Sequence, residues 1–291
     1  MKNSKLRFGG VLGCLGFILA GQISLAKADP LDDIATPISN PVNFEDPRIE
    51  SNIRPIAIYH KLDNKFITQG GNVKIFALQA RYAVTDRLAL IATKDGYVHL
   101  QPDAVLNDES GLANVGGGLK YAFYKDESSI FSGGLRYEAP IGAKRVLQGQ
   151  GSGSFNPFVS GAVALGSERT PLNLVAGTGF RLAVEESDSS FYDADLHLDT
   201  KLGWFSPIAE VNYVHVIDAG DRLPIADEGQ DFFNFGAANA DGKSMLTGAI
   251  GGRVALDKDT SWGTAYQFPL DRSSGSYVTD WRVTTDLIFS F

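Results

Sequence analysis

Four ionisable side chains alternate along one short segment of the chain: Asp193, Asp195, His197 and Asp199. Carboxylate oxygens are ligands that hard cations such as Ca²⁺ prefer, so one interpretation is a cation site. Alternate residues of a strand lie roughly 6.5–7 Å apart, which is too far for all four to hold one ion. The spacing therefore favours the other interpretation. In it, the four residues belong to the water-facing wall of a lumen, and each acid faces a base on a neighbouring strand.

Residue types that carry catalysis are scarce elsewhere. The chain has four histidines and no G-x-S-x-G nucleophile motif. Gly149-x-Gly151-x-Gly153 has the spacing of a phosphate cradle, but no helical pattern follows it, so we expect a loop. The single cysteine, Cys14, lies in the segment that we expect to be removed, which excludes disulfides, thiolate catalysis and cysteine-based zinc sites. We expect neither an enzyme nor a bound cofactor or metal.

The elements that position these side chains have a period of two residues. The last segment shows it best, with one apolar and one polar face. The apolar face is Tyr277, Thr279, Trp281, Val283, Thr285, Leu287, Phe289 and Phe291, and the polar face is Val278, Asp280, Arg282, Thr284, Asp286, Ile288 and Ser290. Twelve such segments lie near 52–61, 73–84, 87–96, 112–124, 129–140, 155–166, 171–184, 190–202, 204–217, 244–256, 260–270 and 277–291. Short connections alternate with mostly longer ones, as in a closed membrane barrel.

A soluble sandwich with one wet face could also alternate. Aromatic residues at the ends of the apolar faces favour a membrane barrel instead, because interfacial girdles need them. The chain also ends on an alternating strand with Phe289 and Phe291, which resembles the signal that the outer-membrane assembly machinery reads. The fold class is therefore all-β, a single antiparallel transmembrane β-barrel of about twelve strands. The His-Asp-Ser-Asn-Gly type motif of twelve-stranded barrel hydrolases is absent.

Charged residues on the polar faces predict a lumen wall of both signs. The candidates are Arg81, Lys120, Arg136, Glu138, Arg181, Asp193, Asp195, His197, Asp199, Glu210, Arg253, Arg282 and Asp286. They either line a permeation path or form a salt-bridge network that closes the lumen. The segment 218–243 is long enough to be functional and carries Phe232, Phe233 and Phe235 as constriction candidates, which either fold into the barrel mouth or stay outside.

The N-terminal 51 residues divide into two parts. Residues 1–28 have a basic start, an apolar core and an Ala26-Lys27-Ala28 cleavage site, as in a secretory signal peptide. Residues 29–51 form an acidic, proline-containing segment that we expect in the periplasm or the lumen, and 52–291 form the barrel. Without the four bases of the leader, the mature chain has 22 bases and 34 acids, a net charge of −12, which argues against nucleic-acid binding.

Several short sequence motifs resemble those of one β-barrel family. They are Phe44-Glu45-Asp46-Pro47-Arg48, Arg54-Pro55-Ile56, Gln69-Gly70-Gly71-Asn72-Val73, Gly116-Gly117-Gly118-Leu119-Lys120-Tyr121 and Asp286-Leu287-Ile288. The family is the group named after a phenol meta-pathway outer-membrane protein, and that name implies passage of small aromatic compounds.

These observations predict a protein of the Gram-negative outer membrane, in contact with outer-membrane lipid and small solutes. Twelve strands lie between the roughly eight of barrels filled by side chains and the roughly sixteen of wide pores. We therefore expect a narrow channel for passive passage of small solutes. The alternative is a structural or anchoring barrel with a plugged lumen and no transport.

Overall fold

The computed structural model describes residues 30–166, 171–272 and 276–291. It contains two short 3₁₀ helices, η1 (Pro30–Asp33) and η2 (Lys144–Val146). The strands are β1 (Asn52–Lys61), β2 (Gly71–Ala83), β3 (Leu88–Lys94), β4 (Tyr97–Pro102), β5 (Glu109–Leu112), β6 (Val115–Lys125), β7 (Ser129–Ala139), β8 (Ser154–Ala164), β9 (Asn173–Ala183), β10 (Ser190–Asp199), β11 (Phe205–Asp218), β12 (Ser244–Ala255), β13 (Thr260–Asp271) and β14 (Trp281–Ser290). The predicted signal peptide lies outside the described residues.

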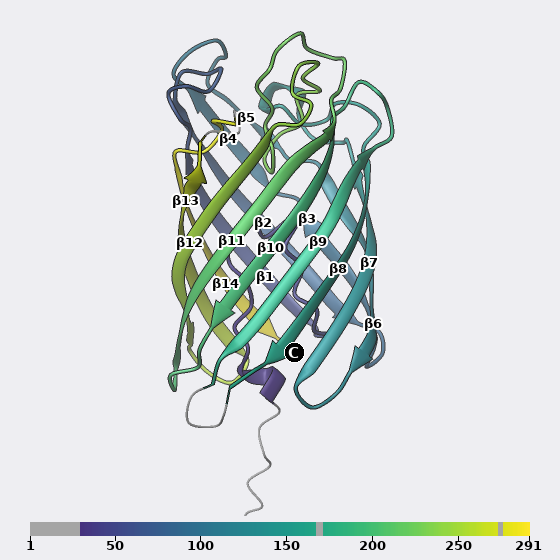
Figure 1. Ribbon diagram of the computed structural model, residues 1–291, viewed down its shortest axis with the longest axis vertical. Helices are drawn as coiled ribbons and strands as arrows, with labels where there is room; N and C mark the ends of the chain where they lie inside the picture. Colours follow the sequence, from purple (N-terminus) through teal and green to yellow (C-terminus); the bar gives the residue numbers. More distant parts are fainter. Residues whose placement is uncertain (1–29, 167–170, 273–275) are drawn as a thin grey trace, which may run out of the picture.

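All the strands belong to one antiparallel sheet that closes on itself (Figure 1). The last strand β14 pairs with β1, from Asn52 opposite Ser290 to Lys61 opposite Trp281. Both β3 and β4 pair with β2 along different parts of its length, so they occupy one position in the ring. The same holds for β5 and β6, which pair with β4 and β3. The predicted twelve-stranded antiparallel barrel is therefore confirmed.

Two predicted boundaries are wrong. The stretch 97–111, predicted as a loop, contains β4 and β5, because Asp95 and Gly96 interrupt a long strand without ending it. Gly96 has a φ of 122°, a conformation that side chains disfavour, and the Asp95 carboxylate accepts a hydrogen bond from the backbone N–H of Leu78. The last strand begins at Trp281 and not at 277, since residues 277–280 belong to the preceding loop.

The two faces of the barrel differ in chemistry. Large apolar side chains on the outer face are exposed, among them Leu90, Leu119, Leu135, Ile250 and Phe289. An apolar surface of this extent is what a lipid-facing barrel needs and what a soluble protein avoids. The inner face carries most of the buried polar side chains. No helix among the described residues is long and apolar enough to cross a membrane.

Candidate functional site in the barrel lumen

The inner wall carries most of the predicted lumen residues in buried positions. Those buried are Arg81, Lys120, Arg136, Glu138, Asp193, Asp195, His197, Asp199, Glu210, Arg253, Arg282 and Asp286. Arg181 is only partly buried. The wall thus brings these thirteen side chains to one interior, and their part in permeation remains a prediction.

The lumen is filled near its middle by the chain itself. Residues 30–51, here called the plug segment, enter at the end of the barrel where η1 and the C-terminus lie (Figure 1). Two small apolar clusters hold it: Leu31, Ile34 and Phe44 against wall side chains that include Val175, and Ala35 and Ile38 against a second set. The remaining contacts are polar.

A buried ion-pair cluster joins the plug segment to the wall. Glu45 lies 2.8 Å from Arg81 Nε on β2 and 2.9 Å from Lys120 Nζ on β6. Burial raises the pKa of the Glu45 carboxyl, but the charges of Arg81 and Lys120 outweigh it, so the pKa falls from 4.5 to about 2. Asp46 binds Arg48 within the segment, and its pKa is also lowered, because the Arg48 charge outweighs the effect of burial. The plug segment is therefore docked in its ionised form.

Backbone amides of the plug segment face the acids of β10 and β11. The N–H groups of Ile38 and Ser39 donate to Glu210 at 2.8 and 2.7 Å, and that of Ala35 donates to Asp199 at 3.2 Å. The prediction that the acids of β10 pair with bases on neighbouring strands is wrong for Asp195, which binds the Asn40 amide of the plug segment, and for Asp199. Asp199 also binds His197 of its own strand, at 3.1 Å, and the amide of Asn173. The plug segment supplies donors that a wall arginine would otherwise provide.

Carbonyl groups of the plug segment face the opposite side of the lumen. Arg54 Nη2 donates to the carbonyl oxygen of Pro37 at 2.7 Å, and Gln79 Nε2 donates to that of Pro41 at 2.7 Å. Arg136 donates to the carbonyl oxygen of Val42. These bonds satisfy the buried backbone of a segment that has no sheet partner.

Asp286 is held between two arginines. Its carboxylate lies 2.8 Å from Arg253 Nη1 and 2.8 Å from Arg54 Nε. Arg253 lies at the end of β12 away from the mouth, beside Ser261 and Thr36.

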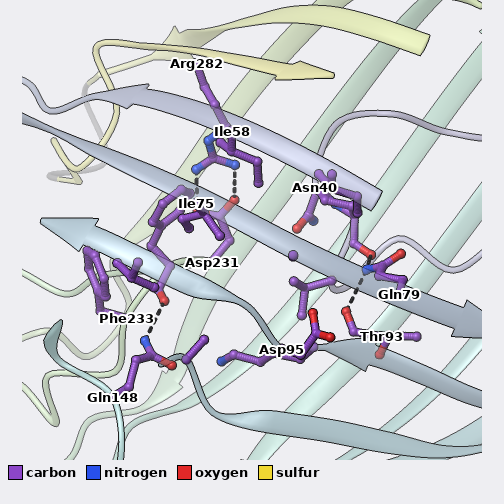
Figure 2. Close-up of a pocket in the computed structure, with 18 residues that line it drawn as sticks. Asn40, Ile58, Ile75, Gln79, Thr93, Asp95, Gln148, Asp231, Phe233 and Arg282 are labelled. Carbon is purple, nitrogen blue, oxygen red and sulfur yellow. Dashed lines mark hydrogen bonds and ion pairs between the residues drawn. The ribbon is translucent and has the colours of Figure 1, made fainter. Parts of the chain in front are cut away.

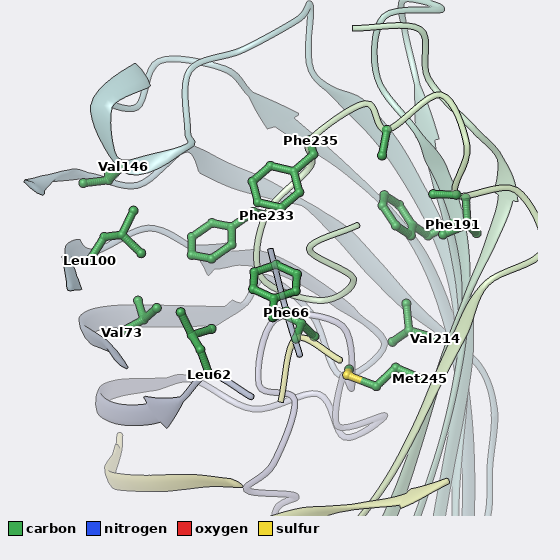
Figure 3. Packing of buried hydrophobic residues seen from close by; sticks show 14 of the residues in the cluster. Leu62, Phe66, Val73, Leu100, Val146, Phe191, Val214, Phe233, Phe235 and Met245 are labelled. Atoms are coloured by element: carbon green, nitrogen blue, oxygen red, sulfur yellow. The ribbon is translucent and has the colours of Figure 1, made fainter. Parts of the chain in front are cut away.

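The opposite mouth is closed by residues 219–243, here called the mouth loop. Asp231 lies 2.7 Å from Arg282 Nη1, and the Phe232 ring lies 4.2 Å from the same guanidinium and 4.3 Å from the His60 ring. The pKa of Asp231 is lowered, because the Arg282 charge outweighs the effect of burial. Figure 3 shows Phe233 and Phe235 packed beside Phe66 in the apolar cluster of the mouth. The three predicted phenylalanines thus lie inside the mouth.

Two small cavities lie beside the mouth loop. A cavity of about 60 Å³ is lined by Asn40, Gln79 and Ile75 on one side and by Asp231 and Phe233 on the other (Figure 2). A second, of about 40 Å³, lies against Arg181 and Glu138. At the end that holds the C-terminus, a vestibule of about 660 Å³ opens beside Arg253. The lumen therefore opens into a vestibule at one end, and further in it is occupied by the plug segment and the mouth loop.

Metal-ligating side chains are not grouped in the described ranges. No group of three or more His, Cys, Asp or Glu side chains is placed there to hold a metal ion. Asp195 binds Asn40, and His197 bridges Asp199 and Glu210, so the alternating acids serve the wall and the plug segment.

Sequence reasoning missed four functional side chains. Arg54, Lys94, Glu45 and Asp231 all make buried or partly buried ion pairs. Arg54 could have been found, because it alternates with Asn52 and His60 on one strand face. The two acids lie outside strands, where no periodicity marks an inward side chain.

The strand order and the two faces of the sheet define a class of protein. It is a closed, antiparallel twelve-stranded β-barrel with an apolar exterior and a polar, occupied lumen. No known protein-family profile matches the chain, and no curated protein matches it. Among solved structures, it is similar to an outer-membrane channel from Pseudomonas putida F1, with 14% identity and a TM-score of 0.55 over 89% of this chain and 100% of that one.

Two further solved structures share the architecture. One is the NanC porin, with 9% identity and a TM-score of 0.50 over 83% of this chain and 98% of that one. The other is the β domain of the Bordetella autotransporter BrkA, with 11% identity and a TM-score of 0.50 over 83% of this chain and 100% of that one. A channel, a porin and an autotransporter share this barrel, so the likeness fixes the fold and not the function.

Proposed function

We propose that the chain is an outer-membrane barrel that passes small solutes through its lumen, closed here by the plug segment and the mouth loop. One observation carries the proposal. The lumen is occupied by chain segments resting on a charged wall, and not by wall side chains that meet across the barrel axis. Such a wall can be solvated by water once the segments move, whereas an apolar core cannot.

The same proposal includes the location of the protein in the cell. Export through a cleaved leader, residues 1–28, and recognition of the C-terminal Phe289 and Phe291 by the assembly machinery would bring the barrel to the outer membrane of a Gram-negative cell. The resemblance to the phenol meta-pathway group makes small aromatic compounds the first solutes to test.

A reversible lock tests whether the plug segment closes the lumen. Ser39 Oγ lies 3.1 Å from Asn212 Oδ1, so cysteines placed at these two positions can be joined by a short bis-methanethiosulfonate cross-linker that reductant cleaves. In planar bilayers, the cross-linked Ser39→Cys, Asn212→Cys protein should conduct less than the same protein after reduction. The matched control is the wild type, which has no cysteine outside the leader and should not respond to reductant.

The mouth loop is tested separately. Deleting Asp227 to Asn239 removes the three phenylalanines and Asp231, and should raise conductance further. Aromatic acids added to either chamber should block the current if they enter the lumen.

The second candidate function is a structural barrel without transport. It is favoured by the buried ion pairs of Glu45, because undocking would strip two wall charges of their partner. If the wild type, the reduced lock variant and the loop deletion all fold and are all electrically silent, this candidate is the better account.

A further inference from the structure

The acids of the inner wall are concentrated on two adjacent strands. Four acids and one histidine lie on β10 and β11: Asp193, Asp195, His197, Asp199 and Glu210. The bases Arg54, Arg81, Lys94, Lys120 and Arg136 lie on β1, β2, β3, β6 and β7. Two further arginines flank the acidic strands toward opposite ends of the barrel, Arg181 on β9 and Arg253 on β12, and Arg253 is paired with Asp286. The acids on those five strands and on β14 are already paired, Glu138 with Lys94 and Asp286 with Arg54 and Arg253.

The acidic and basic strands face each other across the lumen. In the ring order, β10 is six strands from β2 in both directions, so the two are diametrically opposite. The plug segment confirms that they meet at one level: Asn40 binds Asp195 on β10, and the next residue, Pro41, accepts from Gln79 on β2. A transverse electric field therefore crosses the lumen at this level.

The polar groups of the plug segment are oriented along this field. Its N–H groups, at Ala35, Ile38 and Ser39, and the Asn40 amide point to the acidic strands. The carbonyl groups of Pro37, Val42 and Asp46 and the Glu45 carboxylate point to the basic strands. Two carbonyl groups nearer the N-terminus are exceptions: those of Asp33 and Thr36 accept from Asn173 on β9 and Arg253 on β12. From Pro37 to Asp46 the plug segment is thus bound with its donors on one wall and its acceptors on the other.

Both walls have buried hydrogen-bonding atoms that the plug segment does not bind. Within the described residues, Asp195 Oδ2 on the acidic side and Arg136 Nε on the basic side are buried without a hydrogen-bond partner, as are Arg181 Nε and Nη2 on β9 beside the acidic strands. One wall can accept from an ammonium group and the other can donate to a carboxylate.

We propose that the solutes this lumen selects are amphoteric: small molecules that carry both an ammonium and a carboxylate group, such as short peptides. This rests on the proposed channel function and names its substrate class. A solute of one sign meets one wall and leaves the other unpaired, whereas an amphoteric solute pairs with both, as the plug segment does. The plug segment then closes the channel by occupying the site of its own substrate.

Three matched solutes test the proposal: glycylglycine, its N-acetyl derivative without the ammonium, and its amide without the carboxylate. Uptake is measured in liposomes that carry the full-length protein with Glu45→Gln, which loosens the plug segment and leaves both walls intact. Glycylglycine should enter several-fold faster than either derivative.

Wall variants show whether the acids cause this preference. Asp195→Asn, or Asp193→Asn should the first fail to fold, should remove most of the preference of glycylglycine over the N-acetyl derivative. Asp108→Asn is the control, because Asp108 is an exposed loop residue away from the lumen. An unchanged ratio in the wall variant that folds would overturn the proposal.

The outcomes separate this proposal from the one on which it rests. A barrel that conducts salt but admits the three solutes equally, or favours one of the singly charged derivatives, overturns the amphoteric preference and leaves the channel function standing. A folded barrel that passes neither salt nor solute overturns both.

Discussion

Replacing Glu45 with Gln should release the plug segment from the basic wall. The carboxylate serves both Arg81 and Lys120, whose side chains have almost no exposure to solvent. Its pKa of about 2, against an ordinary 4.5, corresponds to about 3 kcal/mol of stabilisation of the docked state. Removing one partner of a buried pair typically costs about 3–5 kcal/mol, which agrees. We therefore expect the undocked fraction to rise by about 10².

The same pair makes docking depend on pH. Because the docked pKa of Glu45 lies below its undocked value, its contribution is complete above about pH 4.5 and disappears as the pH falls toward 2. The wild type should open as acid is added across this window, and Glu45→Gln should be open already and respond less.

Two measurements follow the plug segment directly. Hydrogen exchange of the amides of Ile38 and Ser39 should become faster in Glu45→Gln, and single-channel recordings should show more frequent openings. The control is Asp32→Asn, which removes an exposed carboxylate of the same segment. If Glu45→Gln folds and exchanges those amides as slowly as the control does, the reasoning about this ion pair is refuted.

Three further predictions concern processing, assembly and register. The intact mass of protein from outer membranes should match a chain that starts at Asp29; a mass that includes the leader, or lipid on Cys14, would contradict it. Deleting Phe291 should reduce the heat-modifiable folded band on gels, and an unchanged yield would exclude a role for the terminal aromatic. Leu287→Arg should destabilise the barrel by up to about 2–4 kcal/mol in chemical denaturation if Leu287 lies near the bilayer midplane. Asp286→Asn should also be costly, because Asp286 is paired with two arginines; a neutral Leu287→Arg would mean that the strand faces are reversed.

The barrel itself could be predicted because its signal is local and repeated. Each strand must present alternate residues to two different solvents, so the pattern recurs twelve times and errors at one strand do not spread. The errors fall where that pattern is broken. Asp95 and Gly96 resemble a strand end, yet β4 continues beyond them, because one hydrogen bond from Leu78 and a positive φ bridge the interruption.

The partners of the charged wall residues in the lumen could not be predicted from the sequence. The inward direction of Arg81 and Lys120 follows from alternation, but their partner, Glu45, lies in a segment without periodic structure. The same is true of Arg282 and Asp231. Charges on a wall indicate that partners exist, and only the three-dimensional path of the plug segment and the mouth loop says whether water, a neighbouring strand or the chain itself supplies them.

The balance of forces on the plug segment explains why one ion pair can decide whether the lumen is closed. Undocking exposes a few apolar side chains, among them Ile38 and Phe44, and this opposes opening. It also returns conformational freedom to the whole segment, which favours opening. Most hydrogen bonds lost on the wall can be replaced by water, so they contribute little to the difference. The buried pairs of Glu45 are the exception, because Arg81 and Lys120 would keep their charges in a narrow lumen with no carboxylate beside them.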